Sequence, residues 1–501
     1  MRVNFKNRDI VAIDDFSKED LEYLIQKTKE MRQRELSGQR YSNELKNKKL
    51  ALLFYQDSTR TRTSFETAMK ELGGDVCGFS GTEGTSVKKN ESLYMTIKMY
   101  EANHADAIAI RHPKDGSVQW AADCAEVPVI NCGDGANEHP TQAILDLCTI
   151  DHFHSGITGV NIGYGNDLKN GRTVHSDCIG LSKFPGVTLH LAAPEQLMMP
   201  DYLMALLESR GVKIVLHKTV RSAMQASEIY YQTRPQVNLE KRLTAAEMYR
   251  ICEGHRITTK QIEGLSTKLM HPMPIDSHNE EIEFAVTFTK NQAFLLQAEN
   301  GILSRKASLL EILKDTEYIR FKSSYCSDEL NKSNNKVYLI RGENKNKGRR
   351  YIDEIDNGIA VDHIEIGMAT EIEKSLNLES KRPTVLIGKN MRPYGKVNEP
   401  KKDVMKIFNI EPTQRIIKHI LIKSPDATIN VIRGGERVEK FKALLCENDN
   451  CITRDIPEDV PPKFYYEHDQ VKCHYCRKPH SFNLSVTPEE KENYIKGLPK
   501  K

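Results

Sequence analysis

The stretch from residue 50 to residue 63 reads Leu50-Ala51-Leu52-Leu53-Phe54-Tyr55-Gln56-Asp57-Ser58-Thr59-Arg60-Thr61-Arg62-Thr63. Its six apolar residues predict a fully buried strand. A helix is expected next, because Phe65, Met69 and Leu72 follow at steps of four and three residues and Gly73-Gly74 ends the pattern. The polar turn between them therefore joins the end of a strand to the first turn of a helix.

The same alternation of strand and helix continues from about residue 10 to residue 320. Further strand-like runs occur at 107–110, 127–130, 160–162, 187–189 and 212–215, with amphipathic segments of helical length between most of them. Strands that alternate with helices need crossover connections and form parallel sheets with helices on both faces. Because this region exceeds one usual domain, we expect an α/β fold of two doubly wound parallel-sheet lobes, with a break near Ser155-Gly156.

Length and charge restrict the function classes. The chain has 501 residues, with 72 Lys and Arg against 69 Asp and Glu, so its net charge of +3 provides no basic field for nucleic acid or membrane. No run approaches the ~18 apolar residues of a membrane-spanning helix, and the first residues carry no apolar signal core. We expect a cytoplasmic protein that binds neither nucleic acid nor membrane, and whose cysteines are thiols or metal ligands.

The turn at residues 57–63 predicts an anion site. The first N–H groups of the following helix lack partners within the helix and carry the positive end of its dipole. Ser58 and two threonines add hydroxyl donors, and Arg60 adds a guanidinium that suits phosphate oxygens. A plain helix cap, for which Ser58 or Asp57 alone would suffice, is the alternative. The turn is not a nucleotide-binding P-loop, because that Gly-rich pattern is absent.

Composition changes after the second predicted lobe. Residues 331–350 carry seven basic residues against one acidic residue, which is typical of a solvated linker, and we set the linker at 321–348. Strand-like runs at 384–387 and 427–432 then surround a predicted helix at 414–421. This mixture predicts a small α+β domain at 349–441.

Two cysteine pairs lie in the last predicted domain, residues 442–490. Cys446 and Cys451 are separated by four residues, Cys473 and Cys476 by two, and 21 residues lie between the pairs. Two thiolate pairs complete a tetrahedron around Zn²⁺, so a zinc ribbon with one structural ion is predicted, rather than four unrelated cysteines. Residues 442–480 carry six basic and seven acidic residues, which favours a protein–protein role over nucleic-acid binding.

Six motifs together resemble the transcarbamoylase family. They are Ser58-Thr59-Arg60-Thr61-Arg62, Arg111-His112-Pro113, His139-Pro140-Thr141-Gln142, Asp167-Leu168-Lys169-Asn170-Gly171-Arg172-Thr173-Val174-His175-Ser176, Thr233-Arg234-Pro235-Gln236 and His271-Pro272-Met273-Pro274. Their combination is similar to the catalytic chain of the aspartate carbamoyltransferases. Residues from about 349 onward resemble the regulatory chain of that enzyme family, with its nucleotide-binding domain and its four-cysteine zinc domain. The sequence thus resembles a single-chain fusion of the two.

The resemblance implies that a carbamoyl group passes from carbamoyl phosphate to L-aspartate, giving N-carbamoyl-L-aspartate and phosphate, in pyrimidine biosynthesis. It implies a carbamoyl-phosphate-binding domain at 1–150, completed by about 290–320, and an aspartate-binding domain at 151–289. The residues implied for carbamoyl phosphate are Ser58, Thr59, Arg60, Thr61, Thr85, Arg111, His139 and Gln142, with Arg60, Thr61, Arg111 and His139 catalytic. Those implied for aspartate are Lys89, Arg172, Arg234, Gln236, Pro272 and Met273.

The resemblance also implies partners and effectors. Residues 84–91 resemble a mobile loop that a neighbouring subunit donates, so active sites would be shared within catalytic trimers of a homo-oligomer. In the regulatory part, a site for CTP or ATP is implied. Its residues are Asp362, His363, Lys402, Lys406, Asn430, Ile432 and Lys440.

Five positions depart from the family pattern. Thr85 stands for serine, Asn90 for glycine, Ile275 for arginine, Gly435 for an aromatic residue and Arg437 for a small apolar one. Two alternative functions stay open. One is an ornithine carbamoyltransferase, which usually has His-Cys-Leu-Pro in place of the motif at 271–274. The other is a catalytically degenerate transferase lobe that serves a zinc-ribbon regulator.

Overall fold

The computed structural model describes residues 3–237, 243–316, 357–376, 384–391, 402–410, 427–434, 436–441, 446–455, 462–467 and 470–480, with positions 416, 420, 423–424, 458 and 460 between them. Contacts within the chain divide it into two units, residues 1–321 and 322–501, which are described separately. None of the described helices is both long and apolar enough to cross a membrane.

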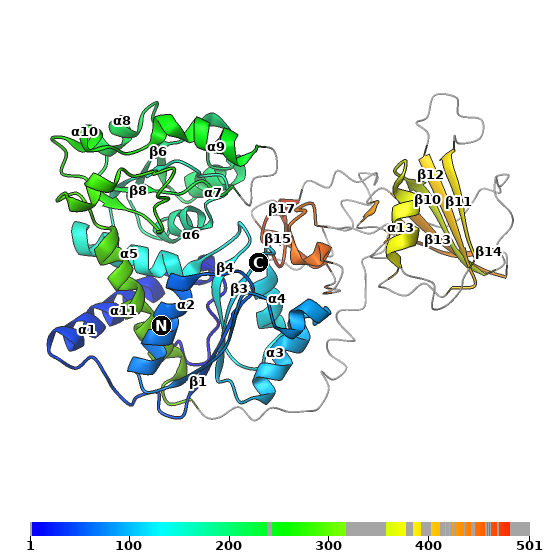
Figure 1. Ribbon diagram of the computed structural model, residues 1–501, viewed down its shortest axis with the longest axis horizontal. Helices are drawn as coiled ribbons and strands as arrows, with labels where there is room; N and C mark the ends of the chain where they lie inside the picture. Colours follow the sequence, from blue (N-terminus) through cyan, green and yellow to red (C-terminus); the bar gives the residue numbers. More distant parts are fainter. Residues whose placement is uncertain are drawn as a thin grey trace. The chain divides into compact units, whose positions relative to one another are not determined.

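The first lobe of the N-terminal unit is built on four parallel strands in the order β2-β1-β3-β4 (Figure 1). These strands are β1 (Lys49–Phe54), β2 (Asp75–Ser80), β3 (Ala107–His112) and β4 (Val129–Asp134). Its helices are α1 (Lys18–Leu36), α2 (Thr59–Glu71), α3 (Leu93–Ala102), α4 (Ser117–Cys124) and α5 (Pro140–His154). All residues of β1 after Lys49 are buried, as the apolar run predicts.

The second lobe contains five parallel strands in the order β7-β6-β5-β8-β9. The strands are β5 (Asn161–Gly165), β6 (Thr188–Ala192), β7 (Lys213–Leu216), β8 (Ile229–Gln232) and β9 (Lys268–Met270). The helices are α6 (Arg172–Leu181), α7 (Asp201–Ser209), α8 (Val220–Gln225), α9 (Ala245–Cys252) and α10 (Thr259–Ile262). The predicted fold of two parallel-sheet lobes is therefore confirmed.

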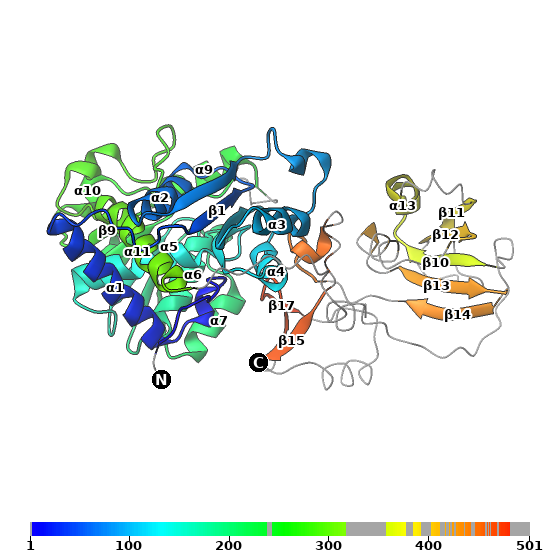
Figure 2. The same ribbon diagram turned by 90° about the horizontal axis from the view of Figure 1, so that it is seen from below.

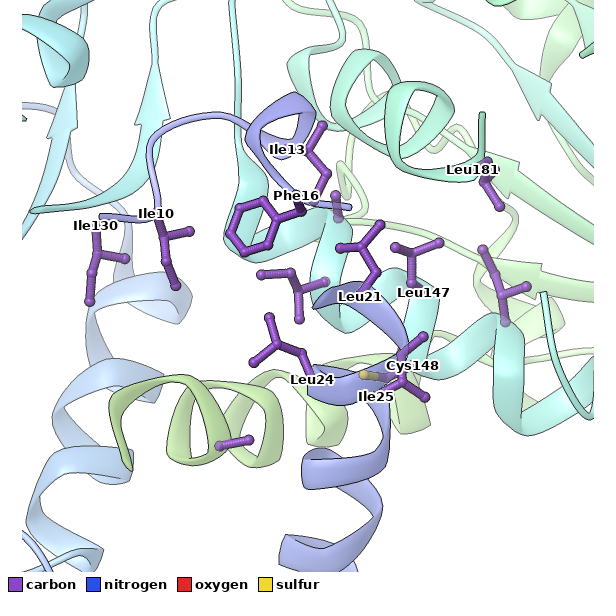
Figure 3. Packing of buried hydrophobic residues seen from close by; sticks show 14 of the residues in the cluster. Ile10, Ile13, Phe16, Leu21, Leu24, Ile25, Ile130, Leu147, Cys148 and Leu181 are labelled. Carbon is purple, nitrogen blue, oxygen red and sulfur yellow. The ribbon is translucent and has the colours of Figure 1, made fainter. Parts of the chain in front are cut away.

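Two segments tie the lobes together. Helix α11 (Phe294–Leu313) follows the second lobe and returns to pack against α1, α2 and α5. At the start of the chain, the 3₁₀ helix η1 (Ile13–Asp15) lies over α5 and α6, and Ile13 shares one buried cluster with Leu147 and Leu181 (Figure 3). The lobes are thus joined by packing as well as by the chain.

An ion-paired carboxylate adds to this junction. Asp14 of η1 accepts hydrogen bonds from Lys183 Nζ at 2.6 Å and from Arg210 Nη1 at 2.8 Å, and both cations belong to the second lobe. Burial opposes ionisation of this carboxyl, but the hydrogen bonds and charges of Arg210 and Lys183 outweigh it and hold the pKa of Asp14 far below its usual value.

The second unit contains an antiparallel sheet of five strands in the order β11-β12-β10-β13-β14. They are β10 (Gly358–Ile364), β11 (Val385–Met391), β12 (Lys402–Phe408), β13 (Thr428–Arg433) and β14 (Glu436–Phe441). Helix α13 (Met368–Leu376) covers one face of the sheet (Figure 2). The strands predicted at 384–387 and 427–432 are confirmed; α13 was not foreseen, and most of the helix predicted at 414–421 lies outside the described residues.

The cysteine-rich part has three short antiparallel strands in the order β15-β16-β17. They are β15 (Phe464–Glu467), β16 (Gln470–Cys473) and β17 (Pro479–His480). Cys473 ends β16, and Cys476 lies in the turn that leads to β17. This small ribbon agrees with the predicted fold of the last domain.

Candidate active site

A cavity of about 800 Å³ opens in the N-terminal unit and is lined by both lobes. It brings together twelve of the residues implied for carbamoyl phosphate and aspartate. They are Ser58, Thr59, Arg60, Thr61, Arg111, His139, Gln142, Arg172, Arg234, Gln236, Pro272 and Met273. Within the described residues, the lining has five arginines and a single carboxylate, that of Asp57, so the cavity is suited to anions.

The N-terminus of α2 forms one end of this cavity. Ser58 precedes the helix, and its side chain makes no capping hydrogen bond, which disfavours the plain-cap alternative and leaves the hydroxyl for a ligand. Arg60 lies in the first helical turn, and burial together with the charge of Arg234 lowers its pKa. Helix N–H groups, hydroxyls and a guanidinium thus converge where a phosphate group fits.

Two further donors line the cavity: Arg111 lies near the end of strand β3, and His139 lies directly before helix α5. Arg111 in β3 donates through Nη1 to the carbonyl of Cys132 at 3.2 Å, and His139 precedes α5, with its backbone N–H donating to Ser176 Oγ at 2.8 Å. Burial first, and then Arg172 and Arg111, lower the pKa of His139 well below its usual value. The imidazole is therefore neutral and offers one N–H donor.

Gly133 permits the two central guanidiniums to approach the backbone. It has a φ of 111°, and a Cβ atom on it would lie 2.9 Å from Cζ of Arg172 and 3.2 Å from Nη1 of Arg111. Arg172 begins α6 and donates through Nη1 to the carbonyl of Gly135 at 2.6 Å. A glycine is thus needed here by both the angle and the contact.

Arg234 and Gln236 reach the cavity from the segment after β8. Arg234 Nη2 lies 3.8 Å from Asp276 Oδ2, and the hydroxyl of Tyr249 donates to the same oxygen at 3.2 Å. The backbone N–H of Gln236 donates to Asp167 Oδ2 at 2.9 Å. These contacts hold a cation and an amide on the second-lobe side of the cavity.

The segment 271–274 is oriented by a buried histidine. His271 Nδ1 accepts a hydrogen bond from the backbone N–H of Met273 at 2.8 Å. The ring proton is therefore on Nε2, which donates to Glu281 Oε1 at 3.0 Å. Both side chains are buried. Ile275 stands where the family pattern usually has arginine. It packs against the apolar cluster that contains Ile282, so this position contributes to packing here.

Thr85 and Lys89 are the two implied residues that do not line the cavity. Thr85 precedes the 3₁₀ helix η2 (Ser86–Lys89), and its hydroxyl donates to the carbonyl of Thr82 at 2.7 Å. Asn90 has a φ of 63°, which is the left-handed region that glycine and asparagine tolerate best. The replacement of glycine by Asn90 therefore keeps the turn after the loop lysine.

The sequence reasoning missed six cavity residues from α11, of which three are polar or glycine. Gln297, Gly301 and Arg305 are spaced by four residues, so they share one face of the helix, and all three line the cavity. Burial lowers the pKa of Arg305 to about 10, which leaves it a cation. The only signal for them was this polar and glycine spacing within a largely apolar helix.

The four predicted cysteine ligands come together in the C-terminal ribbon. All four are buried, and their Sγ atoms lie within 4.8 Å of one another. Cys446 Sγ is 3.6 Å from Cys476 Sγ, and Cys451 Sγ is 3.8 Å from Cys473 Sγ. Thiolates at about 2.3 Å from one tetrahedral ion are about 3.8 Å apart, so the arrangement fits a metal ion and not a disulfide pair.

Three of the seven implied effector residues lie on one line across the sheet of β10 to β14. Ala360 pairs with Lys406 on one side and with Asn430 on the other, and Asn430 pairs with Lys440. Directly paired residues of antiparallel strands point to one face, so Lys406 and Asn430 lie opposite the buried cluster that contains Ile359, Met405 and Ile429. The side chain of Lys440 falls outside the described residues.

Other implied effector residues lie near this line. Asn430 Nδ2 donates to Asp362 Oδ2 at 2.9 Å, and Ile432 pairs with Gly358. Lys402 is at the start of β12, and His363 is exposed. Gly435 and the side chain of Arg437 fall outside the described residues.

Known families match four consecutive parts of the chain. Residues 8–152 match the aspartate/ornithine carbamoyltransferase carbamoyl-P binding domain, and residues 158–312 match the Asp/Orn binding domain. Residues 350–443 match the allosteric domain of the aspartate carbamoyltransferase regulatory chain, and residues 436–485 match its metal binding domain.

Individual relatives agree with these matches. The aspartate carbamoyltransferase catalytic subunit of Thermococcus kodakarensis is 41% identical over 309 residues, which are 61% of this chain and 97% of the relative. That of Methanoculleus marisnigri is 40% identical over 307 residues, 61% of this chain and 99% of the relative.

Solved structures of aspartate transcarbamoylases are also similar. The M. jannaschii catalytic subunit has a TM-score of 0.57 and 34% identity over 62% of this chain and 99% of its own. The Trypanosoma cruzi enzyme in complex with N-(phosphonacetyl)-L-aspartic acid has a TM-score of 0.58 and 31% identity over 62% of this chain and 97% of its own. The comparisons favour the aspartate enzyme over both alternatives. The chain therefore belongs to the aspartate carbamoyltransferase family of transferases, and it carries the catalytic domains and both regulatory-chain domains in one polypeptide.

Proposed function

We propose that the cavity binds carbamoyl phosphate with its phosphate at the N-terminus of α2. The observation that carries this proposal is the convergence of that helix end with Arg60, the hydroxyls beside it and four further arginines in one cavity. Ser58, Thr59, Arg60 and Thr61 would hold the phosphate. Thr61, Arg111 and His139 would donate to the carbonyl oxygen, and Gln142 would bind the carbamoyl amino group.

The reaction needs positioning and charge stabilisation rather than a covalent nucleophile. The amine of aspartate attacks the carbonyl carbon, the C–N bond forms, the C–O bond to phosphate breaks, and the departing phosphate takes up the amine proton. Negative charge develops on the carbonyl oxygen, where Arg111 and neutral His139 offer donors in a buried setting. The departing phosphate keeps its charge balanced by Arg60.

The acceptor is proposed to be aspartate, held by Arg172, Arg234, Gln236 and the backbone carbonyls of Pro272 and Met273. Two carboxylates suit a cavity whose described lining has five arginines and one acid, whereas the cationic side chain of ornithine would be repelled there.

Replacing Arg60 by alanine tests the phosphate site. We expect kcat/KM for carbamoyl phosphate to fall by about 10²–10³, because one charged transition-state donor is lost. Arg62→Ala is the matched control, because Arg62 is two residues away, ion-paired with Glu66 at 3.1 Å, and not part of the cavity lining. Carbamoyl transfer is measured with aspartate and with ornithine; equal rates for the two arginine variants, or faster ornithine turnover, would refute the proposal.

We further propose that active sites are shared in catalytic trimers of a homo-oligomer. Thr85 and Lys89 are implied substrate ligands, yet they lie outside the cavity lining of their own chain. A neighbouring copy that donates residues 84–91 would complete the site, and an isolated chain would then be nearly inactive.

The metal of the cysteine cluster is proposed to be Zn²⁺, with Cys446, Cys451, Cys473 and Cys476 as its ligands. Four buried sulfur ligands favour zinc among common divalent ions, and four ligands leave no open position, so the role would be structural. The ribbon would dock regulatory to catalytic domains.

The regulatory sheet is proposed to bind CTP or ATP along the line of Lys406, Asn430 and Lys440, with Asp362, His363, Lys402 and Ile432 nearby. Lysines that flank uncharged positions suit a polyphosphate.

The domain limits given above (1–150 with 290–320, 151–289, 321–348, 349–441 and 442–490) are kept as proposals. So is the cytoplasmic location, which is supported by cysteines that form no disulfide among the described residues.

A further inference from the structure

A buried carboxylate lies one helical turn below Gln142. Asp146 of α5 is fully buried, and its two oxygens accept hydrogen bonds from three side chains on three elements. Gln142 Nε2 donates to Oδ1 at 3.0 Å and to Oδ2 at 3.2 Å. Gln297 Nε2 of α11 donates to Oδ1 at 2.6 Å, and Tyr231 of β8 donates to Oδ2 at 3.1 Å. Asp146 therefore accepts hydrogen bonds from all three side chains, those of Gln142, Gln297 and Tyr231.

This acceptor determines which way the Gln142 amide points. Because Nε2 is held by Asp146, the carbonyl oxygen Oε1 is the end of the amide that is left for the cavity. A carbonyl oxygen accepts hydrogen bonds, and the amino group of a carbamoyl substrate donates them. A reversed amide would place two donors face to face.

A second carboxyl group beside Asp146 reinforces the arrangement. Asp177 of α6 is fully buried, and neither of its oxygens accepts a hydrogen bond from a described donor. Burial first, and the neighbouring charge of Asp146 second, raise the pKa of Asp177 well above its usual value. Burial raises the pKa of Asp146 as well, but hydrogen bonds from Gln297, Tyr231 and Gln142 oppose that shift, so Asp177 is the one of the two carboxyl groups that keeps its proton.

We propose that Asp146 is a positioning residue for carbamoyl transfer, which holds the Gln142 amide with its carbonyl oxygen toward the carbamoyl amino group. This inference rests on the proposed carbamoyl contact of Gln142. Asp146 itself touches no substrate, and Asp177 serves it as an uncharged donor. The pair therefore acts through the amide of Gln142.

The same carboxylate reaches the aspartate side through Gln297. Nε2 of Gln297 is held by Asp146, and its Oε1 accepts from the backbone N–H of His271 at 2.8 Å. His271 precedes Pro272 and Met273, whose carbonyls are proposed to bind aspartate. One buried carboxyl group thus orients two amides, those of Gln142 and Gln297.

The test uses a double-mutant cycle in the full chain with Gln142→Ala, Asp146→Asn and both together. In Asp146→Asn the new side chain has one acceptor for three donors, so the Gln142 amide is released or reversed. We expect Asp146→Asn to lower kcat/KM for carbamoyl phosphate by about 10- to 100-fold, the range of a hydrogen bond to a charged group. The double variant should lose no more than the larger single loss.

The preference for carbamoyl phosphate over acetyl phosphate distinguishes a positioning role of Asp146 from a general loss of active-site structure. Acetyl phosphate has a methyl group in place of the amino group, so a carbonyl at Gln142 discriminates against it. In Asp146→Asn, the ratio of its inhibition constant to KM for carbamoyl phosphate should fall. Asp151→Asn is the matched control, because it makes the same change five residues along α5, where Asp151 pairs with Lys29 at 2.6 Å. Asp177→Asn, which keeps a donor, should retain the ratio.

The outcomes are distinct. Additive losses in the cycle, or an unchanged selectivity ratio in Asp146→Asn, would overturn the positioning role while leaving the Gln142 contact in place. An unaffected Gln142→Ala variant would instead remove the proposed carbamoyl contact, and the inference with it. If Asp146→Asn does not give folded protein, as judged by thermal unfolding, Asp146→Ser takes its place, since it also removes the charged acceptor and is smaller.

Discussion

Replacing Gly133 by alanine should separate the geometry of the active site from the stability of the fold. Gly133 is the last but one residue of the fully buried strand β4 and has a φ of 111°, an angle that side-chain-bearing residues rarely adopt. The added Cβ would lie 2.9 Å from Cζ of Arg172 and 3.1 Å from its Nε. Because such contacts are shorter than van der Waals distance, Arg172 and the neighbouring Arg111 must move away from the backbone.

The size of the effect follows from these contacts. A misplacement of a substrate-positioning group by about 1 Å costs roughly 10²-fold in rate, so kcat/KM should fall by about that factor. The left-handed backbone angle separately costs about 1–3 kcal/mol of folding free energy. Gly211→Ala is the control that has only the cost in folding free energy, because Gly211 has a φ of 83° and its Cβ would meet nothing within 4 Å.

The assay compares both glycine variants with the unchanged protein. Carbamoyl aspartate formation gives kcat/KM for each substrate, and urea unfolding gives the free energy of unfolding. We expect both variants to lose stability, and only Gly133→Ala to lose about 10²-fold in kcat/KM. If Gly133→Ala were as active as Gly211→Ala, the close approach of the two arginines to this glycine would not matter for catalysis, and the reasoning would be wrong.

Two further predictions concern stability. Asp14→Asn should lower the free energy of unfolding at pH 7 by about 1–2 kcal/mol, since Lys183 and Arg210 lose a partly exposed anionic partner. Because the folded-state pKa of Asp14 is far below its usual value, this stabilisation is complete above about pH 4 and is lost as the pH falls below it, so urea unfolding of the two proteins should converge in acid. Metal chelation should unfold residues 446–480, seen as faster hydrogen exchange, and native mass spectrometry should show the loss of one metal ion per chain; slow exchange that persists in the metal-free protein would contradict a structural metal.

Five of the six strands that could be predicted in the N-terminal unit are almost entirely buried and read as short apolar runs, whereas β7 lies at the edge of its sheet and is exposed or half-buried. The sequence predicted β1, β3, β4, β5, β6 and β7 to within two residues at the start of each. It missed β2, which lies at the edge of its sheet and has a half-exposed, polar sequence with a glycine at 78. It also missed β8, which has four buried residues including the polar Gln232, and β9, which has only three residues. Partial exposure and shortness remove the pattern that marks a strand.

The candidate site was predictable to the extent that its residues occur in contiguous motifs. The turn before α2 brings its donors together through local geometry alone, since a helix N-terminus and its flanking side chains are neighbours in sequence. Gln297 and Arg305 have no such context, and they reach the cavity only because α11 returns from the second lobe to pack on the first.

The sequence by itself determined the alternating strands and helices, the polar turn that leads into α2 and the two cysteine pairs. Each of these depends on residues that are close along the chain. Only the tertiary structure decided that His139 is neutral, that Gly133 must lack a side chain, and that Asp146 orients Gln142. Those properties arise from burial and from charges on distant segments, which no local pattern records, because the electric field and the packing at a point depend on everything folded around it.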